Sequence, residues 1–358
     1  MTQPKYKSVM DWAKDEINKK QLKIGDQFYT ENEICEMLGV SRPTVRNALS
    51  KLEEDNILVR RRGSGTFIAP RRNAKGKTIG FIASGIDEII FPRVLKGIEE
   101  VSYQSGYNVQ IAFTHEDMGL ERSKLQAMAD NAVDGIIVEP LNSGLYNPNE
   151  DIYKQIQSNR IPLIFLEGYY KGSIFPHVSL DHVAAGQLAT EYLINAGHRK
   201  ITGFFMDNYM QARLRYEGYV KALMSHSIGL TPSDIFWFYS YYFGGGVMET
   251  LRHNAAYLLK TLKNYTALMC FDDLYANSLV KLFLENGVRI PEDISVISVG
   301  DSIMAATCPV PLTSVTHPNE RCGMKAAENM IKLIEAPNFN ATFEFAPLIT
   351  ERESVKKL

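Results

Sequence analysis

The sequence predicts a mixed fold: a small N-terminal unit of helices with a basic hairpin, and a much larger α/β body of two parallel-sheet lobes. Residues 30–68 follow the pattern helix, tight turn, helix and hairpin, whereas strand and helix patterns alternate after residue 77. The charge changes at the same place, because residues 1–77 carry 16 basic and 10 acidic residues and the rest carries 23 and 31. With 358 residues, the chain is long enough for two or three packed units.

Composition argues against a membrane or exported protein. The chain has no run of about 18 or more apolar residues, and its first residues lack the apolar stretch of a signal peptide. The four cysteines, Cys35, Cys270, Cys308 and Cys322, have no CxxC or Cys/His metal spacing. We therefore expect a cytoplasmic protein without a metal site, a cofactor or a membrane partner.

The N-terminal unit is expected to contain three helices. The first spans Pro4–Lys20, since proline suits a helix start and apolar residues recur there at helical spacing. Thr30 and Glu33 form a T-x-x-E capping box that begins the second helix, which ends at Gly39, and Ser41 caps the third. The residues expected to be buried are Ile34, Met37 and Leu38 in the second helix and Val45, Ala48, Leu49 and Leu52 in the third.

The buried stripe of the third helix decides which side chains face outward. Arg42, Thr44 and Arg46 lie outside the stripe, near the start of the helix. A recognition helix presents such residues to the major groove, where arginine can pair with guanine and a threonine methyl can meet thymine. The hairpin that follows is tipped by Arg60–Arg62 and Gly63–Gly65. An isolated basic turn is usually solvated surface, but behind a helix-turn-helix it fits a wing that contacts phosphates.

Residues 4–69 resemble the GntR family of bacterial winged-helix regulators. The segments that carry the resemblance are T-E-N-E-I (30–34), L-G-V-S-R-P-T-V-R-N-A-L (38–49) and R-G-S-G-T-F-I (62–68). The resemblance implies a winged helix-turn-helix DNA-binding domain over residues 1–70, a linker over 71–77, and double-stranded operator DNA as a partner. By position it implies DNA contacts from Asn32, Arg42, Thr44, Arg46, Arg62 and Gly63.

Strand and helix patterns alternate in two series through the rest of the chain, which predicts two parallel sheets covered by helices on both faces. In the first series, strands are expected over Thr78–Ala83, Val109–Phe113, Gly135–Glu139 and Leu163–Leu166, and helices over Val94–Gln104, Leu120–Asn131 and Asp151–Ser158. In the second, strands are expected over Lys200–Phe205, Ile235–Tyr239, Ala267–Phe271 and Ser295–Val299, and helices over Ala212–Ser225, Val247–Leu262 and Leu274–Glu285. Two such lobes form a cleft at the carboxyl ends of their strands, where ligands bind.

Polar side chains at these strand ends are the candidate ligand contacts. The acidic ones are Glu139, Glu167, Asp272, Asp273 and Asp301. Any of them could instead cap the next helix, Asp273 most readily because it lies where a helix starts. Several carboxylates at equivalent places favour a polar pocket for sugar hydroxyls, with Phe91, Tyr209 or Trp237 as an aromatic wall unless these rings belong to the core. Arg213 and Arg215 are two residues apart in a helix, so only one of them can reach the cleft.

Residues 78–354 resemble the LacI/GalR effector-binding fold, which is itself similar to periplasmic sugar-binding proteins. The resemblance is carried by segments such as V-D-G-I-I-V-E-P (133–140), V-S-L-D-H-V-A-A-G (178–186), L-I-N-A-G-H-R-K-I (193–201) and P-E-D-I-S-V-I-S-V-G-D (291–301). It implies an effector-binding domain over residues 78–358, with one lobe over 78–178 and 316–340 and the other over 179–315 and 341–358. By position it implies sugar contacts from Phe91, Glu139, Glu167, Arg215, Asp272, His317 and either Gly300 or Asp301.

A GntR-type head on a LacI/GalR-type body resembles the arabinose repressors of Gram-positive bacteria, although a short basic linker stands where the LacI/GalR family has a hinge helix. The resemblance implies a homodimeric repressor of arabinose or arabinan operons that a small-molecule sugar, L-arabinose, releases from DNA. Two alternatives stay open. The same architecture could respond to another sugar, a sugar phosphate or a nucleobase, or Glu139 and Glu167 could be the acid pair of a glycosidase. The sequence has no nucleophile elbow, metal triad or phosphate loop, so we expect no catalytic residue.

Overall fold

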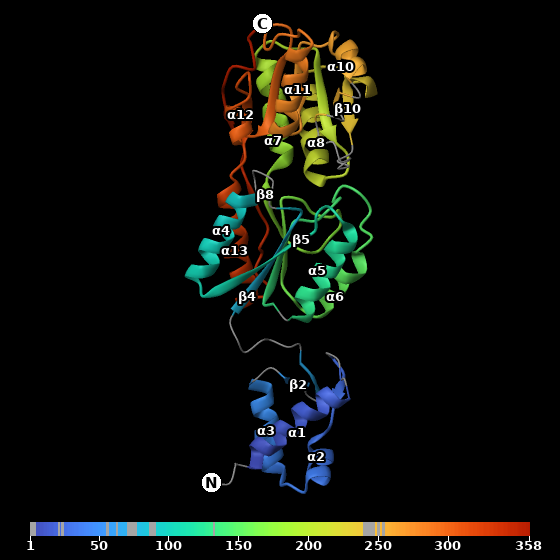
Figure 1. Ribbon diagram of the computed structural model, residues 1–358, viewed down its shortest axis with the longest axis vertical. Helices are drawn as coiled ribbons and strands as arrows, with labels where there is room; N and C mark the ends of the chain where they lie inside the picture. Colours follow the sequence, from blue (N-terminus) through green and yellow to red (C-terminus); the bar gives the residue numbers. More distant parts are fainter. Residues whose placement is uncertain are drawn as a thin grey trace.

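A computed structural model describes residues 5–20, 22, 25–54, 57–61, 64–69, 77–85, 91–131, 133–238, 248, 251–252 and 255–358. Figure 1 shows a helical N-terminal unit, called the head below, and two α/β lobes stacked one above the other. We call the lobe that begins with residue 77 the N-lobe and the other the C-lobe. Several expected features lie outside the described residues: Arg62, Gly63, residues 71–76 of the linker, Tyr239, and much of the start of the helix expected over Val247–Leu262.

The head is a winged helix-turn-helix, as the sequence predicts. Its elements are α1 (Lys5–Lys19), β1 (Gln27–Phe28), α2 (Glu31–Leu38), α3 (Arg42–Glu54), β2 (Leu58–Arg61) and β3 (Gly65–Ile68). Thr30 and Glu33 form both halves of the predicted capping box, and Gly39 ends α2 in the left-handed conformation at φ 61°. The strands form an antiparallel sheet in the order β1-β3-β2.

The core of the head lies between its three helices. All four predicted core residues of α3 are buried, and so is Ile34 of α2. The prediction for Met37 is wrong, since 48% of its surface is exposed. α2 packs on the head through Ile34 and Leu38, which lie one turn apart, so Met37 faces away from that contact.

The N-lobe is a parallel sheet with helices on both faces, and the first predicted series is confirmed. Its strand order is β14-β8-β7-β6-β4-β5, and every pairing is parallel. α4 and α13 cover one face, and α5 and α6 cover the other (Figure 1). The elements are β4 (Lys77–Ala83), α4 (Phe91–Gln104), β5 (Tyr107–Phe113), α5 (Met118–Asp130), β6 (Gly135–Val138), α6 (Glu150–Ser158), β7 (Leu163–Leu166), β8 (His177–Leu180), α13 (Asn319–Glu335) and β14 (Phe343–Phe345).

The C-lobe sheet has the order β10-β9-β11-β12-β13-β15. Its β13–β15 pairing is antiparallel, so the sheet departs from the all-parallel prediction at one edge. The elements are α7 (His182–Asn195), β9 (Ile201–Met206), α8 (Met210–Ser225), a 3₁₀ turn (Pro232–Asp234), β10 (Ile235–Phe238), α10 (Ala255–Leu262), β11 (Ala267–Cys270), α11 (Asp273–Glu285), β12 (Ser295–Gly300), α12 (Ile303–Ala306), β13 (Thr313–Thr316) and β15 (Leu348–Thr350).

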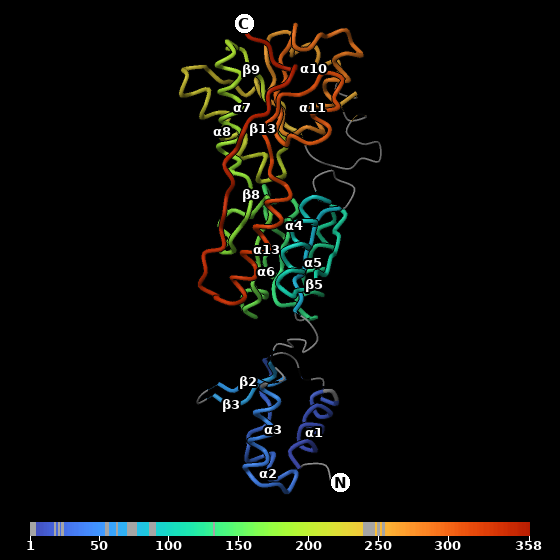
Figure 2. Tube along the Cα trace, turned by 90° about the vertical axis from the view of Figure 1, so that its left-hand side faces the viewer, coloured from blue at the N-terminus to red at the C-terminus, as the bar shows by residue number. Residues whose placement is uncertain are grey.

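Within the described residues, the chain passes between the lobes three times: after β8, after β13 and after β14 (Figure 2). All three crossings fall a few residues later than the boundaries expected at about 178, 315 and 340. Leu180 and Phe343–Phe345 still pair in the N-lobe sheet, and Thr316 still pairs in the C-lobe sheet. Since β8 ends at a crossing into the C-lobe and β13 at a crossing into the N-lobe, the carboxyl ends of both sheets face the other lobe.

Close helix packing fixes one side of this interface. A Cβ atom on Gly186 of α7 would lie 2.0 Å from the backbone oxygen of Arg215 in α8, and one on Gly218 would lie 2.0 Å from that of Val183. The two helices can approach this closely only because both positions lack a side chain. The approach brings Arg215 and the first turn of α7 to the same edge of the C-lobe.

Candidate functional site

The head exposes part of the set of residues that its resemblance selects for DNA contact. Thr44 is half-buried at the start of α3, where its hydroxyl shares a 2.9 Å hydrogen bond with that of Ser41. Arg62 and Gly63 belong to the wing tip outside the described residues. The exposed members are Asn32, Arg42 and Arg46.

A carboxylate that the sequence analysis did not select organises this face of the head. Nε and Nη2 of Arg46 donate to the carboxylate of Glu31 at 3.2 and 3.0 Å, and Nη1 of Arg60 lies 3.7 Å from it. The hydrogen bond from Arg46 lowers the pKa of Glu31. Arg60 also donates to Ser50 at 2.7 Å, so its side chain lies against α3. DNA therefore has to compete with Glu31 for Arg46.

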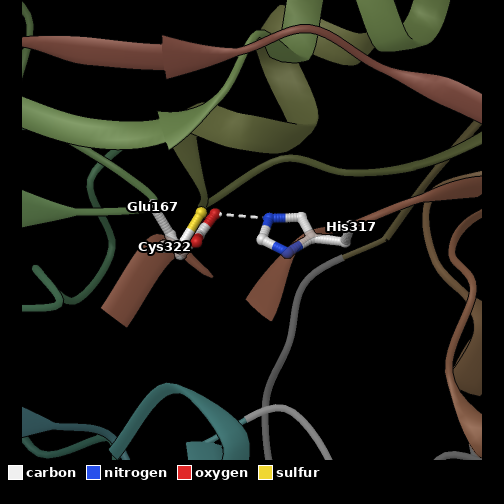
Figure 3. A group of neighbouring side chains, drawn as sticks. All are labelled: Glu167, His317 and Cys322. Carbon is white, nitrogen blue, oxygen red and sulfur yellow. Dashed lines mark hydrogen bonds and ion pairs between the residues drawn. The ribbon is translucent and has the colours of Figure 1, made fainter. Parts of the chain in front are cut away.

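Glu167 is the centre of a buried polar cluster between the lobes (Figure 3). It follows β7 in a left-handed conformation at φ 66° and is 8% exposed. Its Oε2 accepts a 2.8 Å hydrogen bond from Nε2 of His317, which follows β13 of the other lobe. The sulfur of Cys322, on α13, lies within 4.8 Å of the ligand atoms of Glu167 and His317. In the part of the chain that the structure describes, Oε1 of Glu167 has no hydrogen-bond partner.

His182, the first residue of α7, joins this cluster. Its Nε2 lies 3.1 Å from the backbone oxygen of Glu167 and 3.7 Å from Oε2. Its ring is buried and stacked against that of His317, with centroids 6.3 Å apart. Burial lowers the pKa of His182 well below its usual value, and the charge of Arg215 lowers it further. The ring is therefore neutral at pH 7.

Neither His182 nor Cys322 was among the residues expected at this site. His182 directly follows a V-S-L-D strand end, so the criterion that selected the acids could have selected it too. Cys322 lies one turn inside a helix, and nothing in the local sequence shows that it meets Glu167.

Arg215 provides the positive charge of the site. It is 6% exposed, its Nη1 donates to the backbone oxygen of Phe271 at 2.7 Å, and its guanidinium lies 4.8 Å from the centre of the Phe271 ring. Burial lowers the pKa of Arg215 to about 10, which leaves the group charged at neutral pH. Arg213 is exposed and its Nε donates to the backbone oxygen of Asp207 at 2.8 Å, so the two arginines have different surroundings.

Asp272, and not Asp273, caps α11. Oδ1 of Asp272 accepts a 2.9 Å hydrogen bond from the backbone N–H of Tyr275, and burial raises the pKa of Asp272 to about 7. The carboxylate of Asp273 accepts instead from the hydroxyls of Ser298 and Ser314 at 2.6 and 2.7 Å. The expectation that Asp273 is the readiest cap is therefore wrong, because its side chain ties α11 to β12 and β13.

Asp301 is held by the C-lobe itself. It follows β12 at φ 49°, and its Oδ1 pairs with the guanidinium of Arg352. Its Oδ2 accepts hydrogen bonds from the hydroxyls of Thr316 and Thr350, at 3.1 and 2.7 Å. These partners join β12, β13 and β15, so a ligand would have to displace them to reach the carboxylate.

The remaining expected contacts are buried beside strand ends or helix starts. Oε2 of Glu139, after β6, accepts from the backbone N–H of Ser84 at 2.9 Å. Phe91, at the start of α4, and Tyr209, just before α8, are 4% and 9% exposed. Both rings pack in apolar clusters, which agrees with the alternative interpretation that they are core residues.

Several buried polar atoms at the facing lobe edges lack a hydrogen-bond partner among the described residues. All lie just after a strand or in the first two turns of a helix: Oε1 of Glu167, Oδ1 of Asp207, Oε1 of Gln211, Nε of Arg215, Oδ1 of Asn277, Oδ1 of Asn319, and Nδ1 of His182 and His317. A buried polar group without a partner is unfavourable, so the cluster points to a polar ligand. Five of these atoms are carboxylate or amide oxygens, which accept hydrogen bonds.

Glu167, His317 and Cys322 each offer a metal-ligand atom, and these atoms lie within 4.8 Å of one another. Cys322 is also fully buried and packs in an apolar core cluster. Burial raises the pKa of the Cys322 thiol well above its usual value, so the thiol keeps its proton here. The carboxylate of Glu167 therefore has one hydrogen-bonded imidazole partner and a buried thiol nearby.

Direct hydrogen bonds also join the two lobes. In the N-lobe loop after β6, Oδ1 of Asn142 accepts from Nδ2 of Asn208 at 2.8 Å, and Oγ of Ser143 accepts from the backbone N–H of Met210 at 3.1 Å. The backbone N–H of Gly144 donates to the backbone oxygen of Asn208 at 3.0 Å. Asn208 and Met210 lie at the β9–α8 junction of the C-lobe, so the lobes hold each other in this arrangement.

The sequence matches known proteins in both of its parts. Residues 5–68 match the bacterial regulatory proteins of the gntR family, and residues 190–355 match a periplasmic binding protein-like domain. An arabinose metabolism transcriptional repressor of Geobacillus stearothermophilus is 31% identical over 363 residues, which cover 100% of this chain and 99% of the relative. The chain belongs to the family of arabinose metabolism transcriptional repressors.

Further similarities agree with this membership. A repressor of the same description from Halalkalibacterium halodurans is 30% identical, covering 92% of this chain and 89% of the relative. The transcription regulator CcpA of Lactococcus lactis has a TM-score of 0.70 at 24% identity, over 79% of this chain and 100% of that one, which shows the two-lobed fold. The predictions of a DNA-binding, sugar-responsive repressor and of a non-enzyme are confirmed. Among the described helices, none is both long and apolar enough to span a membrane.

Proposed function

We propose that this repressor binds L-arabinose between its lobes, and that the sugar releases it from the operators of arabinose or arabinan operons. Two relatives that match along most of the chain are arabinose metabolism repressors, which supports this choice of sugar. The observation that carries the binding site is the set of buried polar atoms, at the facing lobe edges, that the described residues leave without partners.

The proposed sugar contacts come from both lobes. Glu167 and His317 bring carboxylate and imidazole groups from opposite sides of the interface, and Arg215 and Asp272 stand at the C-lobe edge. Acids suit this role because a carboxylate accepts hydrogen bonds from hydroxyls. The proposed walls of the sugar site are Glu139, Phe91 and Tyr209. We assign Asp301 to holding the C-lobe strands, since Arg352 and two threonines occupy its carboxylate.

A neutral sugar fits these atoms better than a sugar phosphate. Phosphate oxygens are anionic acceptors, so they would face the oxygens of Glu167 and Asp207 without a proton to share. Arg215 supplies positive charge, but one of its donors already serves the backbone of Phe271. The hydroxyls of a pentose can donate to the acidic oxygens and accept from Arg215 at the same time.

We propose that the repressor acts as a cytoplasmic homodimer on a pseudopalindromic operator. Twofold symmetry would place two heads on half-sites about one helical turn, ~34 Å, apart. The domain limits in this proposal are residues 1–70 for the head, 71–77 for the linker and 78–358 for the effector-binding domain, although Lys77 at the end of the linker already pairs with Tyr107 in the N-lobe sheet. The proposed DNA contacts are Asn32, Arg42, Thr44, Arg46, Arg62 and Gly63.

Release requires that the sugar prefer the conformation with low operator affinity. Moving the population from 1:99 to 99:1 takes a bias of roughly 10⁴, or ~5.5 kcal/mol. A change in the angle between the lobes that alters the spacing of the two heads could provide it, as a rigid-body transition.

Calorimetric titration of the full chain tests the choice of ligand. We expect saturable binding of L-arabinose, weaker binding of D-arabinose and D-xylose, and weaker binding still of a pentose 5-phosphate and a purine base. Tighter binding of the phosphate or the purine than of every neutral sugar would overturn the proposal.

A further inference from the structure

His182 has a fixed tautomer. Its Nε2 lies 3.1 Å from the backbone oxygen of Glu167. A carbonyl oxygen can only accept a hydrogen bond, so Nε2 must carry the ring proton. The ring is 2% exposed and neutral, because burial and the nearby charge of Arg215 hold its pKa well below the usual value. Nδ1 therefore keeps its lone pair and can only accept.

That acceptor is buried and unused by the protein. Among the residues that the structure describes, Nδ1 of His182 has no hydrogen-bond partner, and neither has Oε1 of Glu167. The two side chains are in contact, since Nε2 of His182 lies 3.7 Å from Oε2 of Glu167. A histidine kept only for packing would leave a buried lone pair unsatisfied, which an apolar side chain of similar volume would avoid.

We infer that His182 is a specificity-determining residue whose Nδ1 accepts a hydrogen bond from one hydroxyl of the bound sugar, beside a second hydroxyl that donates to Oε1 of Glu167. The inference rests on the proposed function and extends it to a residue that the resemblance did not select. Two acceptors on side chains in contact call for two donors from one ligand, so the ligand class is a neutral sugar with at least two free hydroxyls. Glu167 determines both acceptors. Its side chain provides Oε1, and its backbone oxygen accepts from Nε2 of His182 and so orients that ring.

A cycle that pairs protein variants with ligand analogues tests this contact. The ligands are L-arabinose and its monodeoxy analogues, titrated calorimetrically into the full-length wild type, His182→Phe and His182→Asn. Phenylalanine keeps the ring shape without a nitrogen, and the amide oxygen of asparagine can replace Nδ1 as an acceptor. One neutral hydrogen bond corresponds to roughly a tenfold change in affinity.

We expect the wild type to lose about tenfold in affinity when one particular hydroxyl is removed, and His182→Phe to bind L-arabinose about tenfold more weakly. We expect His182→Phe to bind that deoxy analogue as well as it binds L-arabinose, and His182→Asn to recover part of the discrimination. If His182 had only a structural role, its substitution would lower the affinity for all of these ligands by the same factor.

If His182→Phe discriminates among the analogues as the wild type does, the inference is overturned while the proposed function stands. If the wild type binds no neutral sugar, both are overturned. Circular dichroism and operator binding of each variant show whether it folds, and the asparagine variant carries the test should the phenylalanine variant not fold.

Discussion

Two carboxylates organise the two binding surfaces at the scale of single residues. Glu31 holds Arg46 and Arg60 on the head, and Glu167 holds the imidazoles between the lobes. Each carboxylate is engaged before a ligand arrives, so binding exchanges hydrogen bonds within a preformed group. DNA phosphates and bases must take Arg46 from Glu31, whereas a sugar can use the oxygen of Glu167 that the described residues leave unoccupied.

Removing the charge of Glu31 should strengthen DNA binding. In Glu31→Gln, Arg46 and Arg60 lose an ionised partner and the DNA-facing side loses one negative charge. We expect operator affinity to rise several-fold, with a larger gain at low salt because screening weakens such terms. Fluorescence anisotropy with labelled operator measures it. Glu36→Gln makes the same charge change on α2, and an equal gain in that control would contradict the role of Glu31.

Asp272 should make stability depend on pH near neutrality. Burial raises its folded-state pKa to about 7, above the ordinary value of 3.8, so the folded state binds this proton more tightly than the unfolded state does. This contribution is present below the ordinary value and is lost as pH rises through about 7. Urea unfolding between pH 5 and 8 should show the wild type losing stability relative to Asp272→Asn, which keeps a capping side chain. Parallel pH profiles for the two proteins would refute it.

The sequence could predict polar residues at strand ends but not their partners. Glu167, Arg215 and His317 were accessible because strand ends and helix starts have local patterns. Their pairing was not, since Glu167 meets His317 from 150 positions away. The role of Glu31 was unpredictable for the same reason. In the sequence it is an ordinary acidic residue in the first turn of a helix, and only the folded structure shows that Arg46 of α3 lies next to it.

At the scale of elements, the α7–α8 pair positions the C-lobe side of the site. α7 carries His182 at its first residue and α8 carries Arg215, and the helices touch through Gly186 and Gly218. The spacing of His182 and Arg215 therefore depends on the two glycines that let these helices approach.

A methyl group at this helix contact should destabilise the C-lobe. In Gly186→Ala, Cβ would lie 2.0 Å from the backbone oxygen of Arg215, so the helices must separate, at a cost of about 1–3 kcal/mol. Denaturant unfolding measures the loss, and sugar affinity should fall with it. Gly229→Ala is the control, since none of the described atoms lies within 4 Å of its added Cβ. Equal stability of the two variants would show that the close approach is not needed.

Elements with strong periodicity were predictable, and short or interrupted ones were not. The capped helices of the head and the β-α alternation of both lobes have clear local patterns. β14 and β15 are three residues each, too short for a pattern, and they decide where the chain changes lobe. The predicted burial of Met37 was wrong for a related reason, because burial of a side chain on an eight-residue helix depends on which neighbouring element covers it.

At the scale of the whole molecule, the lobes are joined by crossings and by hydrogen bonds from the loop after β6. Oδ1 of Asn142 in that loop accepts a 2.8 Å hydrogen bond from the side-chain amide of Asn208. The backbone of Asn142 is left-handed, with φ 47°. Sugar bound between the lobes would be enclosed by the same contact, so the contact should favour the sugar-bound arrangement.

Removing that contact should weaken sugar binding. Asn142→Gly keeps the left-handed backbone without strain but loses the amide oxygen, and we expect several-fold lower affinity with faster dissociation. Asn142→Asp retains an acceptor for Asn208 and should bind more tightly than the glycine variant. Stopped-flow measurement of sugar release compares them, and identical rates in the wild type and both variants would remove the loop from the account.

Control of operator binding by L-arabinose can be measured by titrating the sugar into operator complexes of the full-length wild type and of Arg215→Ala in parallel. The account predicts that sugar releases the wild type, and that Arg215→Ala binds the operator with unchanged affinity but no longer responds. An operator complex of the wild type that no concentration of L-arabinose weakens, or a variant that responds as the wild type does, would contradict it.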